Sequence, residues 1–92
     1  MIEIKTESGF SFSVPDERVK DNRELLDALV GWIRGNDSEA TECWMQIPKL
    51  LLGADGYAAL CEHCRDANGV VLSSRVDAEV KEILQEQELI KN

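Results

Sequence analysis

The first fourteen residues show the clearest alternation of hydrophobic and polar positions in the chain. Ile2 and Ile4 face one way, with Thr6 as the next position in phase, and a second alternating run contains Phe10, Phe12 and Val14. A period of two is typical of half-buried strands, and the intervening Glu7-Ser8-Gly9 is a short turn that contains glycine. The pattern predicts a β-hairpin over residues 2–14. Because an isolated hairpin is only marginally stable, its apolar face is expected to pack on helices.

Beyond the hairpin, the spacing of apolar residues becomes helical. Asp21-Asn22-Arg23-Glu24 offers an N-cap acceptor, and Glu24 is placed to reach back as in a capping box. Gly35-Asn36 supplies a stop signal. The first predicted helix lies between these signals, and its apolar positions are Leu25, Leu26, Ala28, Leu29, Trp32 and Ile33.

The middle of the chain is harder to assign. Residues 36–47 have no clear pattern beyond a short turn that Asp37-Ser38 could cap. Proline is disfavoured inside a helix but fits its first position, so a second short helix is predicted from Pro48 to Gly53. A third helix is predicted over residues 55–68 and a fourth over residues 74–87, and residues 89–92 are expected to be frayed.

These elements together predict an α+β fold in a single domain over residues 1–92. The β-hairpin of residues 2–14 is expected to pack against about four short helices within residues 22–88. A chain of this length can bury one modest core, which fits the hydrophobic content of 43%.

The charge balance narrows the classes of partner. Ten basic residues stand against 18 acidic ones, giving a formal net charge of −8. Nucleic acids and anionic membranes are bound mainly through Lys and Arg, so neither is expected as a partner. No signal peptide and no membrane-spanning run is expected, and three cysteines fit a reducing compartment. The sequence therefore predicts a cytoplasmic protein.

The cysteines and the single histidine are the first candidates for chemistry. Cys61 and Cys64 form a C-x-x-C with His63 between them, and Cys43 lies upstream. A structural zinc site needs four ligands, but on a helix His63 would point away from both neighbouring cysteines. The favoured interpretation is that Cys61 and Cys64 are buried as small apolar residues. A zinc-binding or protein–protein adaptor domain that uses Cys43, Cys61 and Cys64 stays open as the alternative.

No reaction is predicted from the remaining residues. The acidic residues are dispersed and several act as caps, the glycines do not form a phosphate-binding loop, and His63 has no nucleophile beside it in the sequence. We therefore expect no catalytic residue, no bound metal and no cofactor. Trp32 fits the apolar side of the first helix, whereas Trp44 and Met45 fall in the irregular segment and could form a contact surface.

Several short strings of the chain resemble small proteins of tailed bacteriophages and prophages that act as tail assembly chaperones. The matching strings are Thr6-Glu7-Ser8-Gly9-Phe10-Ser11-Phe12, Leu25-Leu26-Asp27-Ala28-Leu29, Pro48-Lys49-Leu50-Leu51-Leu52-Gly53, Arg65-Asp66-Ala67-Asn68-Gly69 and Asp77-Ala78-Glu79-Val80. The resemblance covers most of the chain and concerns structural motifs. It implies a non-enzymatic role in the cytoplasm of a bacterial host.

The resemblance also implies a partner. Such proteins cover apolar helical stretches of the tape measure protein until tail-tube subunits displace them, so the tape measure protein and the tail-tube protein are the expected partners. Short amphipathic helices can offer a groove to a partner helix. The candidate partner-binding residues are Trp32, Trp44, Leu50, Leu51 and Leu52. Self-association into a homo-oligomer would hide such a surface in the free protein.

Overall fold

The computed structural model describes residues 1–91. Strands β1 (Ile2–Lys5) and β2 (Ser11–Val14) form an antiparallel hairpin in which Ile2 pairs with Val14 and Ile4 with Phe12. The turn closes through hydrogen bonds between Thr6 and Phe10 and between Gly9 and Thr6, and Gly9 has a φ of +99° that suits glycine. The hairpin lies where the alternation of residues 2–14 places it.

Four helical segments follow, and three of them are long. A single-turn helix α1 (Asp16–Lys20) leads into α2 (Arg23–Arg34), which Asn22 caps by accepting a hydrogen bond from the Leu25 amide. Helix α3 (Asp37–His63) runs for 27 residues, and α4 (Ser73–Glu86) for 14 residues. Helices α2 and α4 correspond to predicted helices, whereas α1 was not predicted from the sequence.

The prediction of a hairpin on about four short helices is wrong, because its second and third helices are parts of one long element. Asn36 caps the start of α3, and the helix continues through Pro48, which is buried. A proline removes one backbone hydrogen bond and crowds the preceding turn, and here tertiary packing outweighs that cost. The real break is Gly53, whose φ of +76° interrupts the helical backbone. Helix α3 then ends at His63 rather than at residue 68.

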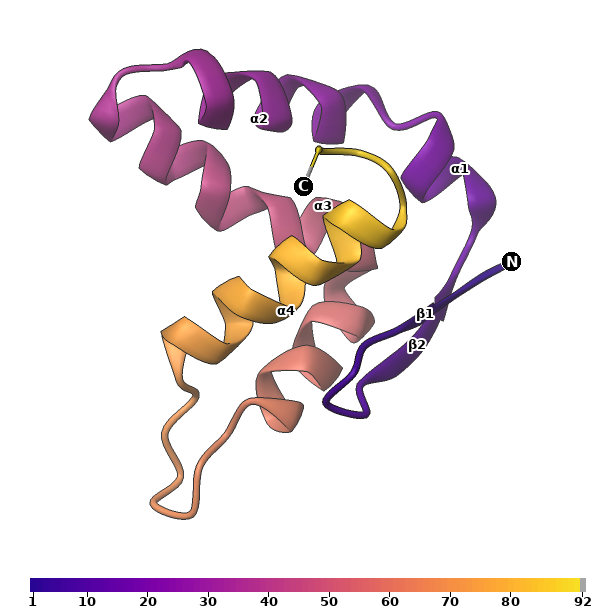
Figure 1. Ribbon diagram of the computed structural model, residues 1–92, viewed down its shortest axis with the longest axis vertical. Coiled ribbons are helices and arrows are strands. Elements are labelled where there is room, and N and C mark those ends of the chain that lie inside the picture. The colour runs from indigo at the N-terminus through magenta and orange to yellow at the C-terminus, as the bar shows by residue number, and fades with distance from the viewer. Residues whose placement is uncertain (92) are drawn as a thin grey trace.

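Helix α3 is the centre of the molecule (Figure 1). Helix α2 packs along α3, and β2 and α4 also contact α3. In Figure 1, α2 follows the half of α3 that precedes the kink, and the hairpin lies by the other half. The core lies where these elements meet, and its completely buried side chains include Ile4, Leu25, Ile47, Leu51, Leu60, Val80, Ile83 and Leu84.

The segment after α4 folds back towards α2 instead of fraying. The Leu89 amide donates a hydrogen bond to the Leu84 carbonyl over 2.8 Å, and Leu89 and Ile90 pack against the core. Glu88 has a φ of 60°, which turns the chain at this point. The expectation of frayed residues 89–92 is therefore wrong for Leu89 and Ile90, and Asn92 lies outside the described residues.

Candidate functional site

The two tryptophans of the predicted partner surface lie together. Trp32 near the end of α2 and Trp44 in α3 have ring centroids 4.5 Å apart at an interplanar angle of 40°. The Trp44 indole donates a hydrogen bond to Asp77 Oδ1 over 2.8 Å, and Lys81 Nζ lies 5.9 Å from the centre of a Trp44 ring. Both tryptophans are half-buried and pack against the core. Trp44 therefore joins α3 to α4, and only part of the pair faces solvent.

The three leucines of the predicted surface are separated by the turn of the helix. Leu51 and Leu52 are buried in the core, whereas Leu50 is half-buried. The Leu50 carbonyl also accepts a hydrogen bond from the Asn22 side chain, which fixes the start of α2 against α3. Leu51 and Leu52 therefore offer no surface to a partner.

A second apolar surface lies on α2, on residues that were not among the predicted partner-binding residues. The side chains of Leu26, Val30 and Ile33 are 49%, 49% and 62% exposed. Positions separated by four and then three residues lie on one side of a helix, so these side chains form a single row. We call this row the α2 stripe. Leu26 and Ile33 are among the apolar positions that the sequence predicts for this helix, and the structure leaves both exposed.

Helix α2 is apolar over an arc wider than its contact with the rest of the molecule. Its core side chains are Leu25, Ala28 and Leu29, and the α2 stripe lies beside them. A helix that lies on a globular core usually needs an apolar arc of somewhat more than 100°. The excess of apolar positions was visible in the sequence and is the signal that could have identified the stripe.

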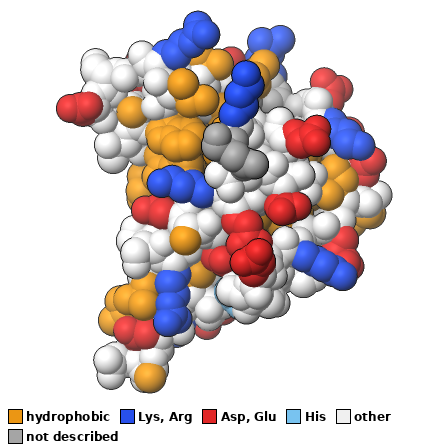
Figure 2. Space-filling view, viewed as in Figure 1, with side chains coloured by type: hydrophobic (Ala, Val, Ile, Leu, Met, Phe, Trp, Pro, Cys, Tyr) orange, Lys and Arg blue, Asp and Glu red, His pale blue; other side chains and the backbone are white. Residues whose placement is uncertain are grey.

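A hollow borders one end of the α2 stripe. Its volume is about 220 Å³, and its apolar lining includes Val19, Leu25, Leu26, Leu29 and Leu89. The opposite edge of the stripe is charged, because Arg23, Asp27 and Arg34 are exposed there. Within residues 1–91, no salt bridge involves any of these three side chains. Figure 2 shows hydrophobic side chains gathered over α2 and the first half of α3, with Lys and Arg side chains close to them.

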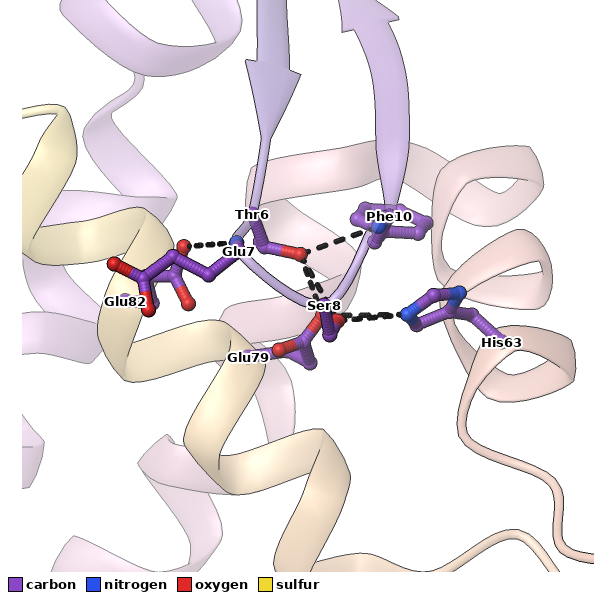
Figure 3. A network of polar contacts seen from close by, with 7 residues as sticks. All are labelled: Thr6, Glu7, Ser8, Phe10, His63, Glu79 and Glu82. Carbon is purple, nitrogen blue, oxygen red and sulfur yellow. Dashed lines mark hydrogen bonds and ion pairs between the residues drawn. The ribbon is translucent and has the colours of Figure 1, made fainter.

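A cluster of polar groups at the hairpin turn is the second feature with potential chemistry (Figure 3). Ser8 Oγ donates to Glu79 Oε1 over 2.6 Å and lies 2.8 Å from His63 Nε2, and Thr6 donates to the same carboxylate oxygen over 2.7 Å. The Phe10 ring lies against the imidazole, with ring centroids 5.6 Å apart. Glu79 is buried, so these hydroxyl donors compensate a carboxylate that has lost water.

The geometry of this polar cluster differs from that of a catalytic triad. In a triad the carboxylate holds the imidazole nitrogen that faces away from the serine. Here Ser8 Oγ and Glu79 Oε1 both face His63 Nε2, at 2.8 and 3.6 Å, and the serine proton is directed to the carboxylate. The arrangement gives Ser8 no general base of the triad type. Its evident role is to attach the hairpin turn to α3 and α4.

The cysteines lie at different places in the structure. Cys43 is half-buried against α2, Cys61 is half-buried near the end of α3, and Cys64 is buried. Burial, followed by the nearby Glu79 carboxylate, raises the pKa of the Cys64 thiol and disfavours the reactive thiolate. Among residues 1–91, no group of three or more His, Cys, Asp or Glu side chains is arranged to hold a metal ion.

Comparison with known proteins adds no relative. No family model matches the chain, and no curated protein or solved structure is significantly similar to it. None of the helices formed by residues 1–91 is both long and apolar enough to cross a bilayer.

Proposed function

We propose that this chain is a non-enzymatic binding protein that holds an apolar helical segment of a partner on the α2 stripe. The observation that carries the proposal is the row formed by Leu26, Val30 and Ile33, each about half exposed or more. Such a row has the spacing with which one helix receives the side chains of another. Trp32 points about 100° away from Ile33 around the helix and stacks on Trp44 of α3, so the tryptophan pair is not part of this row.

The resemblance to tail assembly chaperones suggests the identity of the partner. The tape measure protein is the proposed ligand, and tail-tube protein would displace the chaperone during assembly in the cytoplasm of the bacterial host. The net charge of −8 supports such a role, because it would keep a complex with an apolar segment dispersed. The same charge disfavours nucleic acid and anionic membrane as alternative ligands.

A co-purification experiment tests this proposal. The full chain is co-expressed with a helix-rich fragment of a phage tape measure protein, and the complex is isolated by size-exclusion chromatography. Val30→Asp places a charge in the centre of the α2 stripe and should abolish co-elution. Val70→Asp is the matched control, because Val70 is 53% exposed in the loop before α4, at the opposite end of the molecule from α2 (Figure 1).

The outcomes separate the proposal from its rivals. Co-elution of the wild-type chain and of Val70→Asp, with loss in Val30→Asp, supports binding through the α2 stripe. No co-elution of the wild-type chain at micromolar concentration would refute the proposed partner. Equal co-elution of both variants would show that the partner binds elsewhere on the molecule.

A further inference from the structure

We propose that two copies of this chain pair through α2, antiparallel and about a two-fold axis, so that each copy covers the α2 stripe of the other. The occupant of the exposed helix face is thus a second copy of the chain. Three observations support this choice: the spacing of the stripe, the position of the hollow beside it and the charges along its edge. The inference concerns the free protein and does not require the proposed tail chaperone function.

The spacing of the stripe makes it complementary to itself. The proposed two-fold axis is perpendicular to α2 and crosses it midway between Leu26 and Ile33. Rotation about this axis places Leu26 of one copy opposite Ile33 of the other. The two Val30 side chains then lie next to the axis. Such an isologous contact uses the same surface of both subunits, as most homodimers do. A row of three apolar side chains is thereby covered on each copy.

The hollow beside Leu26 is placed to receive a side chain from the second copy. It measures about 220 Å³ and is lined on its apolar side by Leu26, Leu29 and Leu89. In the antiparallel arrangement it lies level with Ile33 of the second copy. Ile33 is the most exposed member of the stripe, at 62%. A protruding side chain therefore meets a depression, which is how packed helices fit together.

The charges on the edge of the stripe favour the antiparallel direction. Asp27 and Arg34 lie on the same side of the stripe, roughly 60° and 40° around the helix from Val30. In the antiparallel pair, Asp27 of one copy comes within about 3 Å, measured along the helix axis, of the level of Arg34 of the other. The two-fold axis repeats this contact. A parallel pair about a two-fold axis along the helices would instead place the two charged edges on opposite sides of the contact, where Asp27 and Arg34 could not pair across it.

The small size of this surface predicts a weak, exchangeable dimer. Stable interfaces bury about 800 Å² on each partner, and the contact of one 12-residue helix falls at or below that range. The formal charge of −8 on each copy also opposes pairing over longer distances. Weak pairing would keep the stripe covered in the free protein and leave it accessible to a partner of higher affinity.

Sedimentation equilibrium of the full chain in about 0.15 M salt tests the pairing, because long-range repulsion is largely screened there. We expect the apparent mass to rise with concentration from 10.3 kDa towards twice that value. Val30→Asp should remain at the monomer mass, and Val70→Asp should follow the wild-type curve. A circular dichroism spectrum shows whether each variant is folded, and Ile33→Lys provides a second disruption of the stripe if Val30→Asp unfolds.

Charge reversal tests the direction of pairing. Asp27→Arg and Arg34→Asp should each weaken the dimer by roughly threefold to thirtyfold, and the double variant should regain most of the loss. A double variant no better than the single ones would refute the antiparallel arrangement. A wild-type chain that stays monomeric at millimolar concentration would refute the pairing itself.

The charge variants also separate the pairing from the proposed function. They leave Leu26, Val30 and Ile33 intact, so binding of a tape measure fragment should survive in variants that pair more weakly. Weakened pairing with retained fragment binding supports both proposals. A dimer that forms as described, without any binding of the fragment, would refute the proposed function alone.

Discussion

Gly31 in the middle of α2 gives the sharpest test of how α2 and α3 fit together. Glycine inside a helix costs about 1 kcal/mol relative to alanine, so Gly31→Ala on an isolated helix would be stabilising. In this structure a Cβ at position 31 would lie less than 3.0 Å from Cys43 Sγ of α3. Real Cβ atoms do not approach other atoms so closely, and the cysteine side chain or the helix must move.

The two effects can be weighed against each other. Overpacking of this kind costs about 1–3 kcal/mol, because side chains are forced from their preferred rotamers. Against the gain of about 1 kcal/mol in helix propensity, Gly31→Ala should change the free energy of unfolding by between about 0 and −2 kcal/mol. Replacing Cys43 by alanine removes Sγ and leaves Cβ at 3.4 Å, an ordinary contact distance. In the Cys43→Ala background, Gly31→Ala should therefore stabilise by about 0.5–1 kcal/mol.

A double-mutant cycle measures this change of sign. The four proteins are unfolded in urea under reducing conditions and at low protein concentration, so that self-association does not contribute to the free energy. The tryptophan fluorescence of Trp32 and Trp44 reports on the α2–α3 contact. The expected coupling between positions 31 and 43 is about 1–3 kcal/mol. If Gly31→Ala stabilised both backgrounds equally, the close approach of α2 to α3 at Cys43 would be refuted.

Three further predictions concern the backbone and the core. Gly53→Ala should lower the free energy of unfolding by about 1–2 kcal/mol, because φ at this residue is +76° and a Cβ would lie 3.1 Å from Arg18 atoms. If urea unfolding showed no change in stability, the positive φ at Gly53 would be contradicted. Leu51→Ala should lower the free energy of unfolding by about 2–5 kcal/mol, and Leu50→Ala should lower it clearly less because Leu50 is only half-buried. Equal losses of stability in the two variants would contradict the difference in burial between Leu50 and Leu51. Burial raises the pKa of Cys64, so the native state retains a proton that the unfolded state loses, and stability should fall as pH rises above about 9.0. The stability of Cys64→Ala should fall less across the same pH range. If stability fell equally steeply with pH in the variant and the wild-type chain, the raised pKa of Cys64 would be refuted.

The elements that sequence reasoning located are those with local signals. The hairpin has a period of two around Gly9, and α2 is capped by Asn22 and ends before Gly35. Helix α3 has no such signal, because it lies between α2, β2 and α4 and carries buried residues on several sides. Its apolar positions therefore do not repeat along one face, and Pro48 suggested a boundary that tertiary packing does not respect.

The candidate surface was harder to predict than the fold because exposure depends on what covers a side chain. Leu50, Leu51 and Leu52 are adjacent in the sequence, and successive helical residues point about 100° apart, so the run is divided between core and periphery. The row of Leu26 and Ile33 belongs to the same continuous apolar arc as the buried positions of α2. Only the arrangement of α3 and the segment after α4 shows which part of that arc stays uncovered.

The fold itself does not require the α2 stripe. Leu25, Ala28 and Leu29 already attach α2 to the core, so polar side chains could replace Leu26, Val30 and Ile33 at little cost in stability. Surface rows of apolar residues carry a cost in solubility, and the strong negative charge elsewhere on the chain offsets it. Since the half-exposed stripe adds less to the core than Leu25, Ala28 and Leu29 do, its apolar character fits the proposed association, either with a second copy or with the apolar helix of a partner. Both uses bury the same side chains, so in this interpretation the stability of the fold and the strength of association can vary independently.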